Sequence, residues 1–280
     1  MDTTQLRQAI KKFLAEDIGS GDITTTAIFT AGQPGEAVFI AKETFLAAGM
    51  AEVASLVFTT RNPSIRVNDT VADGTRVVPG DILLKAQGPV ADLLQAERVA
   101  LNLVQRLSGI ATHTARFVEA VAPLPVRIVD TRKTTPGLRM LEKYAVRVGG
   151  GHNHRFNLAD GVLIKDNHIA ACGSISEAVA RARRLAPHTL KIEVEAETLA
   201  QVEECLACGV EIILLDNMSP AQLAEAVKIA KGRTLLEASG GVTLANVREV
   251  AASGVDLVSV GALTHSAPAV DISMRLTVSG

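Results

Sequence analysis

The sequence has few aromatic residues and almost no excess of charge. Its 280 residues include no Trp, one Tyr and seven Phe, and the formal net charge is −2 at pH 7. Single-stranded nucleic acids stack on aromatic side chains, and phosphate backbones attract clusters of Lys and Arg. Because the chain has neither an aromatic-rich segment nor a basic block, we expect no nucleic-acid binding.

Long apolar runs are also missing. No run approaches the ~18 residues that a membrane span needs. The segment MDTTQLRQAIKKFLAEDIGSGD at the start has the pattern of a charged amphipathic helix, without the continuous apolar stretch of a secretory signal. We therefore predict no membrane association.

Cysteine is sparse and odd in number, at Cys172, Cys205 and Cys208. Such a set argues for the reducing cytoplasm and against a disulfide framework. Cys205 and Cys208 form a C-x-x-C pair, but it lies in a helical pattern and has no second pair. We interpret these two residues as helix-packing thiols and not as a zinc or redox motif.

The first part of the chain, from Gly35 to about Gly88, contains short strand-like runs separated by turn signals. Helical patterns flank this region at residues 4–15, about 44–58, and from about Val90. One hairpin resembles those of lipoyl and biotinyl carriers, whose modified lysine lies at the tip. Asp73-Gly74 occupies the tip here, so we predict a plain sheet and no carrier function.

After about Pro125 the rhythm changes to short apolar runs that alternate with helices. Strands are predicted at 126–130, 161–165, 190–195, 211–216, 234–239 and 256–261, and helices at 174–186, 197–208, 219–231 and 243–253. This alternation indicates a parallel sheet covered by helices. At least six strands favour an open, incomplete β/α barrel, with a flat doubly wound sheet as the alternative. No Gly-x-Gly-x-x-Gly follows a strand, so dinucleotide binding has no support.

Five of the six predicted strands end in a polar residue and the sixth ends in glycine: Asp130, Lys165, Glu195, Asp216, Ser239 and Gly261. A single polar residue there can simply mark where the chain leaves the core. In a β/α barrel, however, all six positions surround the mouth where active sites are built. The series therefore predicts a polar pocket at that end of the sheet.

Two glycine-containing turns follow the last two strands. Ser239-Gly240-Gly241 precedes a helix predicted to start near Thr243, and Gly261-Ala262 precedes one near Thr264. Backbone N–H groups at a helix N-terminus bind anions, and barrels of this type place phosphate after their last two strands. We predict a phosphate site here, although glycine also serves tight turns.

The segment GGGHNHRFNLADGVLIKDNHI, residues 149–169, gathers cationic and imidazole side chains. A metal site, an anion site and a solvated loop are the three interpretations. A zinc site of His152, His154 and His168 lacks any nearby Cys, and the arginine beside it would repel the ion. The cations Arg132, Lys133, Arg155 and Lys165 instead suit an anion with planar carboxylates or phosphates.

Arg98 lies on the same face of its predicted helix as Leu94 and Leu101. An arginine on an apolar helix face is usually ion-paired, or extends its charged end to solvent. Alternatively, Arg98 crosses a domain or subunit boundary into the pocket. The residues alone leave both interpretations open.

Several motifs resemble those of the quinolinate phosphoribosyltransferase family, also called nicotinate-nucleotide pyrophosphorylase (carboxylating). They are E-D-I-G-S-G-D-I-T-T (16–25), A-E-R-V-A-L-N-L (96–103), S-G-I-A-T (108–112), D-T-R-K-T-T-P-G-L-R (130–139), K-Y-A-V (143–146), G-G-G-H-N-H-R-F (149–156), L-I-K-D-N-H-I (163–169), L-L-D-N (214–217), S-G-G-V (239–242) and V-G-A-L-T-H-S (260–266). The resemblance covers essentially the whole chain, and the motifs between 130 and 169 are highly specific. A related family linked to molybdenum-transport operons typically lacks the N-H-R and K-D-N-H motifs present here.

The resemblance implies a fold and a reaction. The expected fold is an α/β sandwich domain at 1–107, with a tail at 268–280 that packs back on it, and an open β/α barrel at 108–267. The expected reaction converts quinolinate and phosphoribosyl pyrophosphate to nicotinate mononucleotide, pyrophosphate and CO2, with Mg²⁺, in NAD biosynthesis. It also implies a cytoplasmic homodimer, or a higher homo-oligomer, in which the partner's sandwich domain completes the pocket.

Roles for individual residues follow from the same resemblance. Arg132, His154, Arg155 and Lys165, with Arg98 of the partner subunit, are expected to hold the quinolinate carboxylates, and Lys133 to reach phosphate oxygens. Glu195 and Asp216 are expected to hold ribose hydroxyls or Mg²⁺. Thr131, Ser239, Gly240, Gly241, Val260, Gly261 and Ala262 complete the predicted binding set; Lys133, Lys165, Glu195 and Asp216 are the predicted catalytic residues.

Two other functions fit the same pattern of residues. A Schiff-base aldolase would use Lys165 as its nucleophile, but the surrounding arginines argue against it. A non-catalytic accessory protein would keep the barrel and bind a phosphorylated ligand. Degenerate motif positions would favour it, and the sequence has none.

Overall fold

The computed structural model describes residues 2–278 and divides them into two compact units. Unit 1 contains residues up to 114, residues 135–150, and the chain from 267 onward. Unit 2 contains residues 115–134 and 151–266. The predicted division at 1–107 and 108–267 differs from this one, because 108–114 and 135–150 group with unit 1.

Unit 1 is built on a four-stranded antiparallel sheet in the order β12-β1-β5-β3. Its strands are β1 (Pro34–Ala41), β3 (Arg66–Asn68), β5 (Ile82–Pro89) and β12 (Ile272–Val278), and a smaller pair joins β2 (Phe45–Leu46) to β4 (Arg76–Val77). Alternate residues of β1 are buried, as expected for a sheet with one covered face. The C-terminal strand β12 pairs with β1 along its length.

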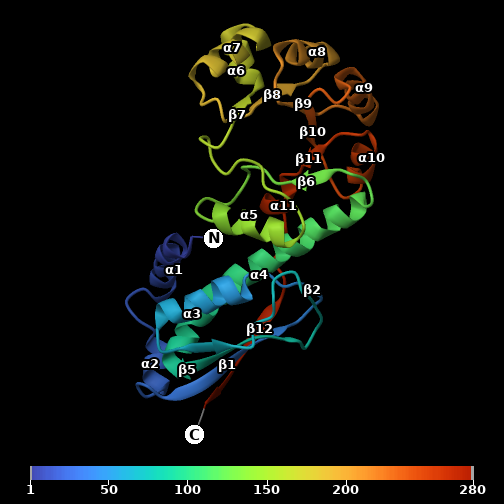
Figure 1. Cartoon of the computed structure of the whole chain (residues 1–280). Coiled ribbons are helices and arrows are strands. Elements are labelled where there is room, and N and C mark those ends of the chain that lie inside the picture. Colours follow the sequence, from blue (N-terminus) through green and yellow to red (C-terminus); the bar gives the residue numbers. More distant parts are fainter. Residues whose placement is uncertain (1, 279–280) are drawn as a thin grey trace. The chain divides into compact units, whose positions relative to one another are not determined.

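Unit 1 also contains helices (Figure 1). They are α1 (Thr3–Ile18), α2 (Ile23–Ile28), the π-helix η1 (Met50–Ala54), α3 (Ser55–Arg61), α5 (Arg139–Val148) and the first part of α4 (Val90–Val121). The predicted helices at 4–15 and from Val90 are confirmed. The prediction of a helix over 44–58 is wrong at its start, because Gly49 has φ +84° and the helical segment begins only after it.

Unit 2 contains a six-stranded sheet in which every neighbouring pair is parallel. The order is β6-β11-β10-β9-β8-β7, so β7 to β11 are neighbours in chain order. The strands are β6 (Arg127–Val129), β7 (Val162–Ile164), β8 (Ile192–Ala196), β9 (Ile212–Asp216), β10 (Leu235–Ser239) and β11 (Leu257–Ser259). A doubly wound sheet would reverse its order part-way. The edge strands β6 and β7 do not pair, and the predicted open β/α barrel is confirmed.

Helices follow most of these strands (Figure 1). They are α6 (Asp166–Cys172), α7 (Ile175–Leu185), α8 (Leu199–Cys208), α9 (Pro220–Ala230), α10 (Val247–Ala252) and α11 (Ala262–His265). Side-chain caps fix several of their starts, among them Ser174 at α7, Thr198 with Gln201 at α8, and Ser219 with Gln222 at α9. In the part of the chain that the structure covers, no helix is both long and apolar enough for a membrane span.

Candidate functional site

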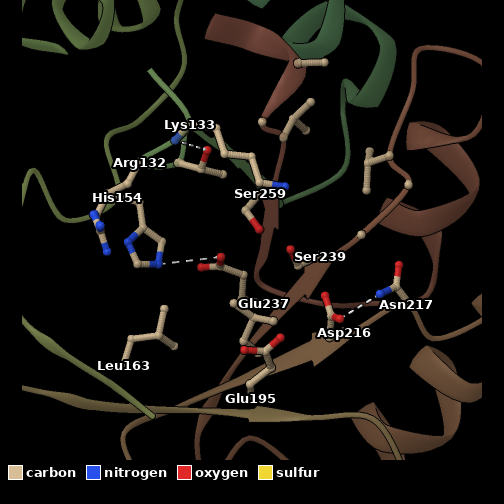
Figure 2. Close-up of a pocket in the computed structure, with 18 of the residues that line it drawn as sticks. Arg132, Lys133, His154, Leu163, Glu195, Asp216, Asn217, Glu237, Ser239 and Ser259 are labelled. Atoms are coloured by element: carbon tan, nitrogen blue, oxygen red, sulfur yellow. Dashed lines mark hydrogen bonds and ion pairs between the residues drawn. The ribbon is translucent and has the colours of Figure 1, made fainter. Parts of the chain in front are cut away.

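A pocket with a volume of about 830 Å³ lies at the carboxyl ends of the parallel strands, entirely within unit 2. Figure 2 shows Arg132, Lys133 and His154 across from side chains of strands β8 to β10. Every predicted binding residue except Arg98 lines it: Thr131, Arg132, Lys133, His154, Arg155, Lys165, Glu195, Asp216, Ser239, Gly240, Gly241, Val260, Gly261 and Ala262. The roles assigned to these residues stay predictions.

Strand alternation brings these side chains together. Side chains two apart on a strand point to the same face. Ser239 is paired in register with Asp216, whereas Glu195 is paired with Leu214, two residues before Asp216. These inward side chains therefore lie at two neighbouring levels, and together they form the pocket floor predicted from the strand ends.

Glu195 and Lys165 form a partly buried ion pair, with Lys165 Nζ 3.7 Å from Glu195 Oε2. Burial raises the pKa of Glu195, the nearby Lys165 charge lowers it, and Asp216 raises it. The Lys165 side chain is half exposed, so its ammonium can also reach a bound anion. A carboxylate and a cation are thus held side by side at the rim.

The Arg155 guanidinium is fixed by its own loop, because Nη1 donates to the Gly161 carbonyl at 3.0 Å. Burial and the nearby Arg132 charge lower the pKa of Arg155. Two guanidinium groups repel one another when no ligand is bound. An anion that binds between them removes this repulsion and forms favourable interactions with both. This arrangement favours a ligand with more than one negative group.

Asp216, Asn217 and Gly240 lock two neighbouring loops together. Asn217 Nδ2 donates to Asp216 Oδ2 at 2.7 Å, and the Asn217 N–H donates to the Ser239 carbonyl at 2.9 Å. A Cβ on Gly240 would lie 2.2 Å from Asn217 Oδ1, and Gly240 has φ +93°. Only glycine fits here, which keeps a stretch of bare backbone at the pocket wall.

Of the two helix starts predicted beside the glycine turns, the one near Thr243 is wrong, whereas a helix does begin close to Thr264. Helix α10 starts at Val247 instead of near Thr243, because Asn246 Oδ1 accepts the Thr243 N–H and closes a turn. Helix α11 starts at Ala262 and has four residues. Such short helices supply little dipole, so any anion would be held by the glycine loops themselves.

Asp130 ends its strand as predicted but does not line the pocket. It is fully buried, and its Oδ1 and Oδ2 accept from the His154 N–H at 2.9 Å and Asn153 Nδ2 at 2.6 Å. Asp130 therefore holds the His154–Arg155 loop in place against β6.

Eight further residues line the pocket that were not in the predicted set: Leu163, Leu214, Asn217, Glu237, Val242, Thr243, Ser259 and His265. Glu237 lies two residues before Ser239 on β10, so the alternation of the strand carried the signal. Glu193 lies in the same way two residues before Glu195, and it bonds His154 from inside the sheet.

The three-histidine zinc interpretation is not supported. His168 Nδ1 accepts the Lys165 N–H at 2.9 Å, which caps α6. Within residues 2–278, the group of His, Cys, Asp and Glu close enough to share an ion is His154, Glu193 and Glu237. Glu195 and Asp216, the residues predicted to hold Mg²⁺, are not in this group. An ion bound by these two carboxylates would need further ligands from water or substrate.

Arg98 lies in unit 1 on α4 and is exposed, while Leu101 on the same face is buried. Burial raises the pKa of the neighbouring Glu97, and the Arg98 charge partly offsets this. Whether Arg98 serves another subunit stays a prediction. The three cysteines are free, and Cys205 is buried on α8 as a packing thiol.

Comparison with known proteins covers the whole chain. Residues 22–108 match the N-terminal domain, and residues 110–275 the C-terminal domain, of quinolinate phosphoribosyl transferase. The chain belongs to the quinolinate phosphoribosyltransferase family. A Bacillus subtilis relative, named a probable nicotinate-nucleotide pyrophosphorylase (carboxylating), is 46% identical over 279 residues, which is 100% of this chain and 96% of the relative.

Other members agree in sequence and in fold. The nicotinate-nucleotide pyrophosphorylase (carboxylating) of Mycobacterium leprae is 46% identical and covers 96% of each chain. The crystal structure of NadC from Streptococcus pyogenes has a TM-score of 0.96 at 45% identity, covering 100% of this chain and 99% of that one. The family's two-domain architecture is therefore present here in full.

Proposed function

We propose that the pocket of unit 2 catalyses the reaction for which its family is named: phosphoribosyl transfer to quinolinate with decarboxylation. One observation carries the proposal. Two arginines and two lysines share one cavity with the rim carboxylates Glu195 and Asp216 and with two glycine loops: Arg132, Lys133, Arg155, Lys165, Ser239–Gly241 and Gly261. That set suits a dianionic ring and a sugar phosphate together.

The diacid fits the inner part of the pocket. Arg132 and Arg155 offer planar donors for its two carboxylates, with His154 and Lys165 beside them. Each charge-assisted hydrogen bond contributes about 1.5–3 kcal/mol. Nicotinate has a single carboxylate and would leave part of this charge unpaired.

The phosphoribosyl group fits the glycine loops. The backbone of Gly240, Gly241 and Gly261 would receive the 5′-phosphate, and Lys133 would reach pyrophosphate oxygens. Glu195 and Asp216, near one another at the strand ends, would hold the ribose hydroxyls. These contacts fix the C1′ carbon of the sugar against the ring nitrogen.

The chemistry needs no protein nucleophile. The bond between C1′ and the pyrophosphate oxygen breaks and its electrons leave with pyrophosphate. The ribose then carries positive charge, which the Glu195 and Asp216 carboxylates stabilise, and the ring nitrogen lone pair forms the new bond. The bond from ring C2 to its carboxylate next breaks, CO2 leaves, and the electron pair stays on C2 until a proton is added.

Mg²⁺ fits this pocket as a companion of pyrophosphate and not as a resident ion. Mg²⁺ retains several waters and binds through one or two carboxylates plus phosphate oxygens. Asp216 is the carboxylate free of an ion-pair partner at the rim, since Glu195 is paired with Lys165. When bound, Mg²⁺ would neutralise charge on the leaving pyrophosphate.

A direct assay tests the function. Purified protein with quinolinate, phosphoribosyl pyrophosphate and Mg²⁺ should release CO2 and pyrophosphate in equal amounts. Replacing quinolinate by nicotinate should abolish most turnover. Equal turnover of the two acids would contradict the proposed use of the cations, and binding without turnover would favour the accessory-protein alternative.

We also propose a homodimer in which Arg98 of the partner subunit completes the pocket. Exposure of Arg98 on unit 1 supports this, because the residue is free to meet another copy. Arg98→Ala should keep its fold and lose activity, and mixing it with Lys165→Ala should restore part of the activity through hybrid dimers. No recovery after demonstrated subunit exchange would contradict the shared pocket.

The three free cysteines support a cytoplasmic location.

A further inference from the structure

A second cavity lies at the opposite, amino-terminal ends of the same strands. Its volume is about 430 Å³, and its lining includes Arg127, Val162, Ile212, Leu235 and Leu257, which begin or nearly begin five of the six strands. Arg127 and Leu235 are exposed, so solvent reaches this cavity. The sheet therefore has an aqueous space at both ends of its interior.

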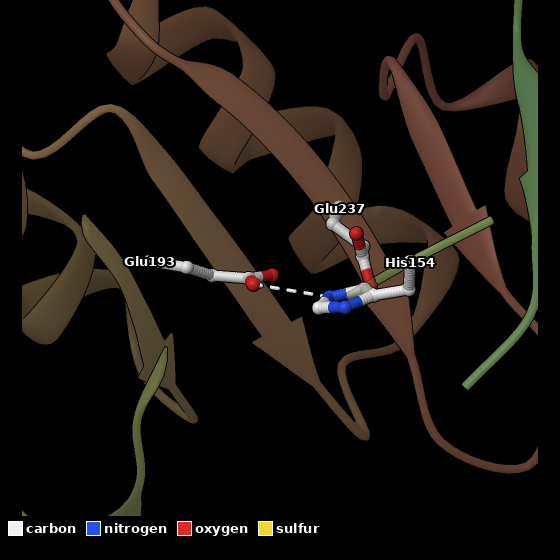
Figure 3. Close-up of side chains that lie close together, drawn as sticks. All are labelled: His154, Glu193 and Glu237. Atoms are coloured by element: carbon white, nitrogen blue, oxygen red, sulfur yellow. Dashed lines mark ion pairs between the residues drawn. The ribbon is translucent and has the colours of Figure 1, made fainter. Parts of the chain in front are cut away.

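The two cavities share a polar wall. His154, Arg155 and Glu237 line both of them. His154 Nε2 lies 3.0 Å from Glu193 Oε2 and 3.7 Å from Glu237 Oε1, and the ring connects the two strands (Figure 3). His154 Nδ1 accepts the Arg155 N–H at 2.8 Å, so the ring hydrogen is on Nε2 and points toward the carboxylates.

The wall brings two buried carboxylates together around one imidazole, and the Arg155 charge lies close to Glu193. Glu193 and Glu237 are 4% and 1% exposed, and a buried oxygen of each, Oε1, has no hydrogen-bond partner. Two buried carboxylates this close do not both ionise near neutral pH, so one of them retains a proton. Burial, and then the Glu193 charge, raise the pKa of Glu237 to about 7, while His154 and the Ser259 hydroxyl lower it and Asp130 raises it.

The proposed reaction requires a proton at this place. After CO2 leaves, ring C2 holds an electron pair and must gain one proton to give nicotinate mononucleotide. The cations around the diacid are poor acids at neutral pH, since guanidinium and ammonium groups retain their protons there. Glu237 instead offers a carboxylic acid at the inner wall of the pocket.

Resting on the proposed function, we propose that Glu237 is the acid that protonates ring C2 after decarboxylation and is reprotonated from the second cavity. Glu193 and His154 are positioning residues, because they hold the acid between the two spaces. In the step, the Glu237 O–H bond breaks, a C2–H bond forms from the carbanion pair, and the carboxylate left behind takes a proton from water in the second cavity.

Single turnovers test this proposal. The probe is quinolinate with phosphoribosyl pyrophosphate and Mg²⁺ at pH 7, with pyrophosphate and nicotinate mononucleotide quantified separately after rapid quenching. In Glu237→Gln, the amide keeps the shape but cannot act as the acid, so nicotinate mononucleotide formation should slow at least about 100-fold while pyrophosphate release slows far less. Glu237→Asp should recover part of the lost rate.

Equal slowing of both products, or no slowing, in a folded Glu237→Gln variant overturns the proposal. So does a stoichiometric divalent ion bound by His154, Glu193 and Glu237 in the purified protein. If the variant fails to fold, the wild type still decides: its product-forming phase should slow as the pH rises above about 7, and a phase independent of pH overturns the proposal. A wild type that releases no pyrophosphate overturns the function itself, and the acid with it.

Discussion

The interior of the parallel sheet has two layers of charged groups with different surroundings. In the outer layer, Lys165 is half exposed and pairs with Glu195 at the pocket rim. In the inner layer, Glu193 and Glu237 are almost completely buried around His154. Water and substrates can balance the outer charges, whereas the inner charges depend on each other. Substitutions in the outer layer should therefore affect the reaction, and those in the inner layer should also change stability.

The largest effect is expected from Glu195→Gln in the outer layer. The amide removes the negative charge that would stabilise the positive ribose, which should lower kcat by about 10²–10³-fold. Steady-state kinetics with both substrates at saturation measure this. Glu197→Gln is the matched control, because Glu197 lies two residues further on, is exposed and does not line the pocket; an equal loss in that variant would show a general charge effect instead.

The next largest effect is expected from Arg155→Lys, which should weaken the binding of quinolinate. Lysine keeps the charge but not the planar pair of donors, so KM for quinolinate should rise about tenfold or more, as expected for one lost charge-assisted bond. KM for phosphoribosyl pyrophosphate should stay unchanged. Arg181→Lys on the exposed face of α7 is the control, and a rise in both KM values for Arg155→Lys would contradict the assignment to the diacid.

Gly240→Ala compares two adjacent glycines of the phosphate loop. Both have positive φ, but a Cβ at Gly240 would meet Asn217 while one at Gly241 would meet nothing within 4 Å. Thermal unfolding should show a loss of about 2–4 kcal/mol for Gly240→Ala, from clash and strain together, and about 1–2 kcal/mol for Gly241→Ala from strain alone. Equal losses would mean that the loop moves away from Asn217.

The smallest expected effect is a change in how the stability of the protein depends on pH when Glu237 of the inner layer is replaced. Because the pKa of Glu237 is raised from 4.5 to about 7, the folded protein binds more protons than the unfolded chain in that range, and stability falls as the pH rises through it. In Glu237→Gln this contribution is absent, so the decrease in Tm between pH 5 and pH 8, on the order of a few degrees, should shrink. Glu225→Gln, on the exposed face of α9, is the control, and its Tm should decrease between pH 5 and pH 8 as much as that of the wild type. An equally large decrease in the Tm of Glu237→Gln would contradict a protonated inner layer.

The outer layer could be predicted from the sequence because strand ends and barrel topology place it. Five of the six residues that end the predicted strands line the same mouth, whatever the details of the loops, and buried Asp130 is the exception. The inner layer was missed although E-V-E at 193–195 and E-A-S at 237–239 show the alternation. The residues next to a carboxylate in a strand do not reveal which distant side chain it contacts. Glu193, Glu237 and His154 are far apart in the sequence and are brought together only by the order of the strands in the sheet.

Local turn chemistry explains the other differences. Residues 243–246 can form either a turn or the first turn of a helix. In the structure the Asn246 side chain bonds Thr243 and Gly241 and closes the turn, so α10 starts later than predicted. The wrong helix start before Gly49 has a similar origin, because Gly49 takes a left-handed φ of +84°, and a Cβ there would lie 3.0 Å from Leu107 and 3.3 Å from Val53. The place of Arg98 in an assembly depends on a second copy of the chain, which a pattern in one chain does not contain.

The central claim is that one cavity of a nearly neutral protein collects cations to hold a pyridine dicarboxylate. A crystal structure of the protein soaked with quinolinate tests it most directly. We predict density for the diacid at the carboxyl ends of the strands, with its carboxylates on Arg132 and Arg155 and its ring nitrogen facing the Ser239–Gly241 loop. Density for quinolinate elsewhere, with both arginines unengaged, would contradict the account.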